Sequence, residues 1–542
     1  MMQSRRWTSA TLALLIAGAA ALAQTQEPST PSTSSYRIAG TIVDAISGAP
    51  LGKTRVLLAP TEDRTRIRTF ITAPDGKFVF EDLSPAKYSL MAERHGFPTQ
   101  IFDMHENYGT AIVAGEGQDT EHLAFRLKPA ASIEGRVLDN FGEPMRKACI
   151  RSFYSGTVGG AQSIVPLRPL ETDDQGMYQL QNLPAGKYFV AVSAKPWFAE
   201  AASSDSSTDS SAQRSVLDVA YPFTFFPGVT DWHAATAISL KFGQRATANF
   251  TMQILPAIHV RISTGDRGSA TTKLFVHPFD VGEIELGTEQ IQSQTAGEGR
   301  QQWVEIAGIP PGHYLLQMSF PSGRAIRSEV NWSGDASLSI AQFPDATMEA
   351  LISGEILFDG KANAPTKPDL VLQNRNSRAI YHTGIAADGT FKGLSVPPGA
   401  YEVHVANAAD FFVWGISADG ALVSGTLLDI KHPGRIRLSV VATRSLGTIK
   451  GFATKNGTAA PGCMVVLVPR NLNNRALYRR DQSDSDGSFF LRSVLPGDYV
   501  VFAINDWDVE WSKPENTKTY LTDGTIVHVV GNDVQSIEVK VQ

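Results

Sequence analysis

The sequence predicts an all-β fold made of about five tandem antiparallel β-sandwiches. Three observations predict it. A glycine-bearing strand recurs along the chain, a turn with an acidic residue and glycine follows it, and a tyrosine stands twelve residues beyond the turn glycine. The chain has 542 residues, which is too long for one hydrophobic core, so several domains are expected.

The opening strand of a repeat has a glycine between apolar positions, as in Ile38-Ala39-Gly40-Thr41-Ile42. The same pattern returns at Gly135, Gly354 and Gly451. Short segments with period-two alternation between turn signals are typical of antiparallel sandwiches. The pattern therefore predicts that each glycine marks the first strand of a new sandwich.

The second half of the repeat is more regular. The turn glycines are Gly76, Gly176, Gly389 and Gly487, the aromatic residues two positions later are Phe78, Tyr178, Phe391 and Phe489, and the tyrosines are Tyr88, Tyr188, Tyr401 and Tyr499. Asp-Gly tolerates positive φ, so we expect these turns to close hairpins. The tyrosine should start a strand with its ring in the core and its hydroxyl on a backbone group, like the tyrosine corner of immunoglobulin-like sandwiches.

Each repeat is expected to end in a last hairpin, for example 237–240 with 248–252 and 525–529 with 537–541. The third repeat is degenerate, because Gly297-Glu298-Gly299 replaces the acidic turn and the opening strand at 259–262 lacks glycine. The predicted sandwiches span 36–129, 130–255, 256–347, 348–444 and 445–542. A serine-rich stretch, 199–215, is expected to be a loop inside the second.

The first 23 residues predict a signal peptide. Arg5 and Arg6 precede an apolar run, and Ala21 and Ala23 supply the small residues of a cleavage site, with 24–35 as a linker. No later segment is apolar enough to span a bilayer, so we expect a mature chain without a transmembrane span, in the periplasm or outside the cell. Cys149 and Cys463, far apart in the chain, are expected to be buried thiols.

The run from Tyr36 to Phe97 resembles the carboxypeptidase regulatory-like family. The resemblance rests on the glycine strand, Ser47-Gly48-Ala49-Pro50-Leu51, Asp75-Gly76-Lys77-Phe78, and the stretch from Leu83 to Tyr88. The second, fourth and fifth repeats match at the positions given above. The resemblance implies a transthyretin-like (prealbumin-like) sandwich of seven strands, an accessory domain that does not itself catalyse a reaction.

No catalytic motif is present, and the sequence predicts no catalytic residues, no cofactor and no metal site. Asp484-Ser485-Asp486-Gly487 resembles the start of a calcium loop, but Ser493 occupies the position that needs a bidentate glutamate. A turn is therefore favoured. The net charge of −6 forms no basic stripe, which argues against a nucleic-acid partner.

Tryptophans provide the candidate ligand-binding residues. Trp197, Trp414, Trp507 and Trp511 follow tyrosine strands, where loops are expected, and an exposed indole can stack on a sugar ring. The alternative is that these rings cap the ends of the sandwiches.

Three functions stay open: a non-catalytic exported binding or scaffold protein of the cell envelope, a carbohydrate-binding protein that uses aromatic loops, and an accessory subunit of an envelope hydrolase or transporter. A hydrolase with an unrecognised site is a further alternative. The expected partner is a polysaccharide or another envelope protein.

Overall fold

The computed structural model describes residues 35–199, 215–265, 270–280, 283–286, 292–296, 302–320, 325–343, 349–359, 367–375, 379–408, 411–472 and 474–542. The predicted signal peptide, nearly all of the linker and nearly all of the serine-rich loop lie outside these residues. Within them the chain is built of β-strands, with short 3-10 turns and one short α-helix, α1 (Pro514–Thr517). An all-β fold is confirmed.

Ten of the eleven sheets among the described residues form five facing pairs, which we call sandwiches 1 to 5. In sandwich 1 one sheet contains β1 (Tyr36–Asp44), β4 (Lys77–Leu83) and β8 (Leu123–Leu127). The facing sheet contains β2 (Arg55–Pro60), β3 (Arg68–Ile71), β5 (Ala86–Arg94), β6 (Phe97–Ile101) and β7 (Ile112–Ala114).

Sandwich 2 has two sheets and a small extra ribbon. The first sheet contains β9 (Ala131–Leu138), β13 (Met177–Leu183), β18 (Arg245–Thr247) and β19 (Phe250–Thr251). The second contains β10 (Cys149–Val158), β11 (Ala161–Pro166), β12 (Leu170–Glu171), β14 (Gly186–Ser193), β16 (Thr224–Phe225) and β17 (Ile238–Leu240). The ribbon pairs β15 (Val219–Ala220) with β20 (Leu255–Pro256).

Sandwich 3 has the same organisation, although its repeat is degenerate in sequence. One sheet contains β21 (Ile258–Ser263), β24 (Gln292–Ala296), β25 (Trp303–Ile309) and β28 (Ala336–Ser339). The other contains β22 (Thr271–Val276), β23 (Ile284–Glu285), β26 (Gly312–Ser319) and β27 (Ala325–Trp332).

Sandwiches 4 and 5 complete the chain. One sheet of sandwich 4 contains β29 (Ala350–Phe358), β32 (Thr390–Val396), β34 (Phe412–Asp419) and β37 (Arg435–Thr443). The facing sheet contains β30 (Asp369–Asn374), β31 (Ile380–Gly384), β33 (Gly399–Ala406), β35 (Leu422–Ser424) and β36 (Leu427–Ile430). One sheet of sandwich 5 contains β38 (Gly447–Lys455), β39 (Thr458–Ala459), β42 (Ser488–Val494) and β45 (Val534–Lys540). The facing sheet contains β40 (Met464–Pro469), β41 (Arg479–Gln482), β43 (Gly497–Ile504) and β44 (Thr525–Val529).

A separate hydrophobic core lies between the two sheets of each sandwich. Alternate residues of central strands such as β9 and β37 are buried in it, as the sequence alternation predicts. In β40 every residue is buried, because a further apolar cluster with Trp511 covers the outer face of that sheet. The residue boundaries of the domains stay a prediction.

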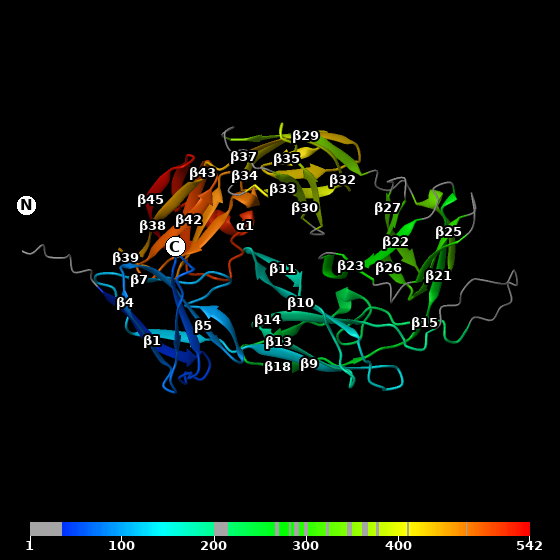
Figure 1. The fold of residues 1–542 in the computed structure, drawn as a ribbon, viewed down its shortest axis with the longest axis horizontal. Helices are drawn as coiled ribbons and strands as arrows, with labels where there is room; N and C mark the ends of the chain where they lie inside the picture. The colour runs from blue at the N-terminus through cyan, green and yellow to red at the C-terminus, as the bar shows by residue number, and fades with distance from the viewer. Residues whose placement is uncertain are drawn as a thin grey trace, which may run out of the picture.

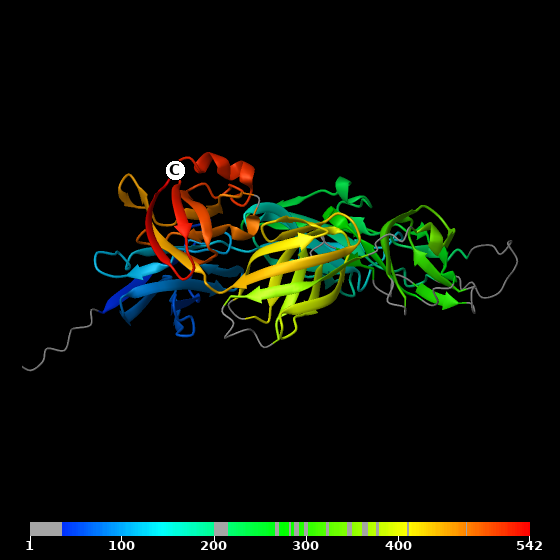
Figure 2. The same ribbon diagram turned by 90° about the horizontal axis from the view of Figure 1, so that it is seen from above.

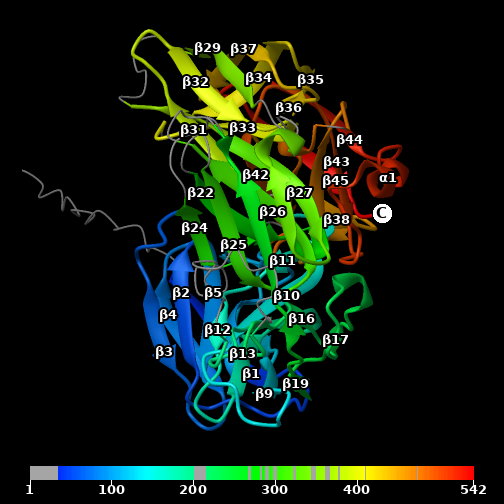
Figure 3. The ribbon, with the colours of Figure 1, turned by 90° about the vertical axis from the view of Figure 1, so that its right-hand side faces the viewer.

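The five sandwiches are arranged in a closed ring. Sandwiches 1 and 2 form one side, sandwiches 4 and 5 the other, and sandwich 3 joins the two sides at one end (Figures 1 and 3). Seen from above, the β38–β45 segment lies against the first sandwich (Figure 2). The first and last sandwiches therefore meet, although the length of the chain separates them.

The recurrent glycine of the opening strand allows a close approach of the last strand. In sandwich 4, β29 pairs with β37 in parallel, and a Cβ on Gly354 would stand 1.8 Å from the carbonyl oxygen of Leu438. A Cβ would clash in the same way with a backbone carbonyl oxygen at Gly40, Gly135 and Gly451 in their own sandwiches. Only glycine fits at this position, which explains the motif.

The predicted tyrosine corner is present in every sandwich. Each tyrosine hydroxyl donates to the carbonyl oxygen four residues earlier, at 2.5–2.9 Å; the tyrosines are Tyr88, Tyr188, Tyr314, Tyr401 and Tyr499. All five rings are buried. The bond fixes the turn before the strand to the strand itself.

The predicted hairpins are wrong, although the turns exist. The turn at Gly76 joins β3 to β4, and these strands belong to opposite sheets. The last two strands behave in the same way, since β44 pairs with β43 whereas β45 pairs in parallel with β38. Turn residues set the local φ, but the two facing sheets decide which strand lies alongside.

Two further predictions can be compared with the structure. Cys463 is buried as predicted, whereas Cys149 is half-buried, and both thiols are free. Among the described residues, no helix has the length and apolar character of a membrane-crossing segment.

Candidate functional site

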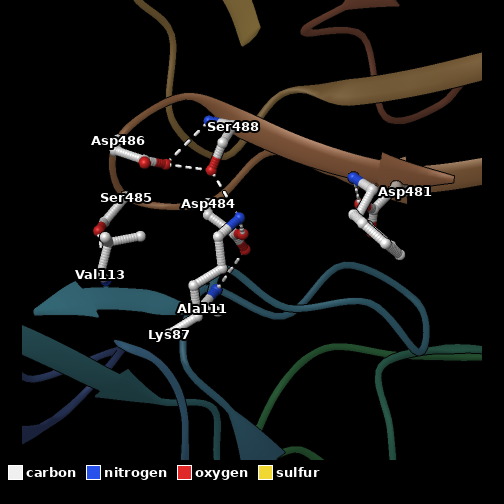
Figure 4. Close-up of polar contacts among 9 residues, drawn as sticks. Lys87, Ala111, Val113, Asp481, Asp484, Ser485, Asp486 and Ser488 are labelled. Atoms are coloured by element: carbon white, nitrogen blue, oxygen red, sulfur yellow. Dashed lines mark hydrogen bonds and ion pairs between the residues drawn. The ribbon is translucent and has the colours of Figure 1, made fainter. Parts of the chain in front are cut away.

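The contact between sandwiches 1 and 5 is a polar region that joins distant parts of the chain. The Lys87 ammonium on β5 donates to the Asp484 carboxylate at 2.5 Å and to the Ser488 hydroxyl at 2.7 Å. These side chains point toward one another across the contact (Figure 4). Lys87 is 34% exposed and Asp484 15%, so the ion pair is largely withdrawn from water.

The turn that carries Asp484 also binds the backbone of sandwich 1. Asp484 accepts the Ala111 N–H at 3.1 Å, the Ser485 N–H donates to the Ala111 carbonyl at 3.0 Å, and the Val113 N–H donates to the Ser485 hydroxyl at 2.9 Å (Figure 4). The turn thus satisfies backbone groups along β7. Asp486 holds the turn in shape by accepting the Ser488 N–H.

Burial determines the electrostatics of the contact. It raises the pKa of Asp484, and the Lys87 ammonium opposes that rise. Burial also raises the pKa of the neighbouring Asp481 to about 6, against the hydrogen bond from the Phe490 N–H. A buried carboxylate has lost its water and depends on its cationic partner. Removal of that partner would leave an unpaired buried charge, which is costly, so the contact is specific for its partners.

Arg480 forms the second half of the contact. Its side chain is 1% exposed, and the guanidinium pairs with Glu106 of sandwich 1 at 2.9 Å. It lies over the rings of Tyr108, Trp507 and Trp511, at 4.5, 4.9 and 6.0 Å from their centroids. Cation–π contacts of a desolvated arginine are worth about 2 kcal/mol or more. The residue therefore binds both sandwiches at once.

Further bonds surround this arginine. The Gln482 amide donates to the Asp103 carbonyl at 2.6 Å and to the Thr110 hydroxyl at 2.8 Å. Trp507 stacks on His105 with 3.9 Å between centroids. Burial lowers the pKa of that histidine. Sandwich 1 is thus held by charged, polar and aromatic contacts over one continuous surface.

Sandwich 2 joins the same contact through its β10–β11 turn. Gly160 adopts φ +79°, and its carbonyl accepts the Ser512 N–H at 3.0 Å. A Cβ at this glycine would lie 2.3 Å from the indole of Trp511, so glycine allows the turn to rest on the ring. The Gln162 N–H donates to the Glu510 carboxylate at 2.5 Å. Sandwich 2 therefore meets sandwich 5 at Trp511, beside the Arg480 contact with sandwich 1.

The structure places the four predicted tryptophans in different surroundings. Trp197 is 88% exposed in a turn after β14. Trp414 is 52% exposed, but it lies on β34 rather than in the expected loop, and its indole N–H donates to Pro496. Trp507 and Trp511 lie together at the contact with sandwich 1, and Trp511 is 7% exposed. Their binding of a ligand stays a prediction.

Sequence reasoning missed the residues that form the contact. The tryptophans and the Asp484 turn drew attention, but Lys87, Glu106 and Arg480 did not. One signal was available, because 479–482 is a run of four polar residues, Arg-Arg-Asp-Gln, in a repeat that has an entirely apolar strand, Met464–Pro469, shortly before it. Within the described residues no group of three or more His, Cys, Asp or Glu side chains is placed to hold a metal ion.

The chain was compared with curated proteins and with solved structures. No curated protein matches it. Similar solved structures include the Bacillus anthracis TIE protein (11% identical, covering 95% of this chain and 76% of that one, TM-score 0.17). Others are the minor pilin GBS52 of Streptococcus agalactiae (13% identical, 41% and 97% covered, TM-score 0.22) and the major pilin BcpA of Bacillus cereus (11% identical, 58% and 100% covered, TM-score 0.15).

The family comparison concerns the first sandwich. Residues 37–128 match the model of the carboxypeptidase regulatory-like domain. This range begins in β1 and ends just after β8, so it covers both sheets of sandwich 1. Sandwich 1 is therefore similar to a carboxypeptidase regulatory-like domain over its whole length.

Proposed function

We propose that this chain is a non-catalytic exported scaffold protein of the cell envelope, whose ring of sandwiches holds binding surfaces at fixed positions. The contact between sandwiches 1 and 5 carries the proposal. Tandem domains joined only at their chain connections are expected to move relative to one another. Here the Lys87–Asp484 pair and the Arg480 cluster add a second attachment that closes the ring.

A closed ring has a functional advantage for a scaffold. Ordering of mobile parts on binding costs free energy, and a frame that is already ordered avoids that cost. The partner is expected to be another envelope protein or a polysaccharide. Export is supported by the predicted signal peptide at residues 1–23.

Disulfide trapping tests ring closure in solution. Ala111 and Ser485 are joined by a backbone hydrogen bond across the contact, so a double variant Ala111→Cys/Ser485→Cys should form an intramolecular bridge on mild oxidation. The two single variants are the controls for the native thiols. Absence of a bridge, or bridging only between copies, would contradict a ring closed within one chain.

Two simpler measurements test export and the absence of catalysis. Mass spectrometry of the exported protein should find a chain that begins after Ala23. Peptide and glycoside libraries should show no turnover. Turnover that disappears on a single acidic-residue substitution would show that the protein is an enzyme.

Carbohydrate binding is the second candidate, and the exposure of Trp197 and Trp414 favours it. Affinity electrophoresis in a panel of polysaccharides tests it with Trp197→Ala and Trp414→Ala. Phe141→Ala, at an aromatic side chain that is 74% exposed, is the matched control. Mobility that is unchanged in every polysaccharide, or equally changed in all variants, would remove this candidate.

A further inference from the structure

A cavity of about 1610 Å³ lies inside the ring, between sandwiches 2, 3 and 4. Sites for single small molecules usually measure roughly 300–1000 Å³, so this one has room for a segment of a polymer. Its walls come from three sandwiches, and β11 stands near the centre of the ring (Figure 1). The cavity is separate from the contact between sandwiches 1 and 5.

Strands at the edges of sheets line this cavity. Lining residues belong to β11, β27 and β31, and Glu283 and Leu286 flank β23. Each of these four strands is the last in its sheet, and among the described residues no further strand pairs with its outer side. An edge strand presents backbone donors and acceptors that can pair with an added chain.

The backbone of β11 shows which groups are available. The Leu167 N–H, just beyond β11, donates to the Ser152 carbonyl of β10, whereas the Gln162 N–H points the other way and donates to Glu510. Inward and outward groups alternate along an antiparallel strand. The N–H and carbonyl of Ile164 therefore point away from β10, and Ile164 lines the cavity.

The remaining walls are aromatic, proline-rich and balanced in charge. The lining includes the aromatic residues Tyr221, Phe223, Phe225, Trp232, Tyr314 and Tyr381, and prolines from all three sandwiches, among them Pro166, Pro310 and Pro397. Three cationic and three anionic side chains, Lys195, Arg327, Arg375, Asp231, Glu283 and Glu329, also line it. An occupant with apolar side chains and little net charge suits these walls.

We propose that the cavity binds an extended, largely apolar peptide segment of a partner protein, which adds as a strand to the open edge of β11. Strand addition derives its affinity from backbone hydrogen bonds and its specificity from pockets for alternate side chains. A sugar fits less well, because Trp232 is the one tryptophan among the lining residues and His233 stacks on it at 3.6 Å.

The test uses the mature full-length chain on two arrays, one of random octapeptides and one of neutral oligosaccharides. The best-bound peptide is then titrated by calorimetry into wild type, Ile164→Pro and Ile164→Ala. Proline removes the outward N–H without removing a bond to β10, whereas alanine keeps that N–H. We expect proline to weaken binding about tenfold relative to alanine, since one backbone hydrogen bond is lost.

Hydrogen exchange of the wild type provides a readout that does not depend on the folding of a variant. Bound peptide should protect the Ile164 amide. The proposal is overturned if no peptide binds, if only oligosaccharides bind, if proline and alanine variants bind equally, or if Ile164 gains no protection. A ring that closes in the disulfide test but binds no peptide contradicts this proposal alone, and leaves the scaffold proposal standing.

Discussion

Lys87 donates a hydrogen bond to the carboxylate of Asp484, although 397 residues separate them in the chain. Lys87 lies in the first sandwich, which matches the carboxypeptidase regulatory-like model, and Asp484 lies in the last sandwich. The pair thus attaches the two ends of a row of sandwiches to each other. Because Asp484 is largely buried, its charge depends on this partner.

Removing the Arg480 side chain should destabilise the contact strongly. Arg480→Ala leaves Glu106 without its cationic partner and opens a space between Tyr108 and Trp507. Loss of one partner of a buried pair costs about 3–5 kcal/mol, so the urea midpoint of the first unfolding transition should fall. The control is Arg492→Ala, an exposed arginine over Phe490. Equal midpoints for both variants would show that Arg480 does not stabilise the contact.

The tyrosine corner should be worth about one hydrogen bond in each sandwich. Tyr401→Phe removes the bond to the Pro397 carbonyl and keeps the buried ring. We expect a loss of about 1 kcal/mol in the unfolding free energy of sandwich 4. Tyr36→Phe, at a half-buried tyrosine, should change stability less. A Tyr401→Phe protein as stable as wild type would mean that the hydroxyl contributes nothing.

The strand glycine should tolerate no side chain. Gly354→Ala would place a methyl group 1.8 Å from the Leu438 oxygen and push β29 away from β37, at a cost of about 1–3 kcal/mol. Gly415→Ala is a matched control on β34 of the same sandwich, where no described atom lies within 4 Å of the added methyl group. Calorimetric melting of both variants checks this. If the two melt together, close approach does not explain the motif.

Asp481 should make sandwich 5 less stable as the pH rises. Its pKa is raised by burial to about 6, so the folded state binds this proton more tightly than the unfolded state does. The stabilisation that protonated Asp481 provides is therefore present at low pH and is lost between about pH 4 and 6. Asp481→Asn should flatten the dependence of the urea midpoint on pH in that window.

The control for this titration is Asp388→Asn. Hydrogen bonds from Thr390 lower the pKa of Asp388, so its contribution has the opposite sign. The Asp388→Asn variant should therefore keep the decline of the urea midpoint between about pH 4 and 6. A wild-type midpoint that rises with pH through this window, and rises equally in Asp481→Asn, would contradict the assignment to Asp481.

The sequence predicted what depends on local patterns. Spacing from Gly389 to Tyr401 fixes the turn and the tyrosine corner, since both are short-range features. It did not predict which strands pair, because a turn at Gly76 has the same residues whether it closes a hairpin or crosses between sheets. It could not predict that Arg480 meets Glu106, because this contact depends on how separate sandwiches are placed in the ring.

Small-angle X-ray scattering tests the closed ring most directly. Wild type, Lys87→Glu and the double variant Lys87→Glu/Asp484→Lys should be compared at the same ionic strength. We expect a compact wild type, a larger maximum dimension when Lys87→Glu places two carboxylates together, and partial recovery when the charges are exchanged. An extended wild type, or three identical scattering curves, would contradict it.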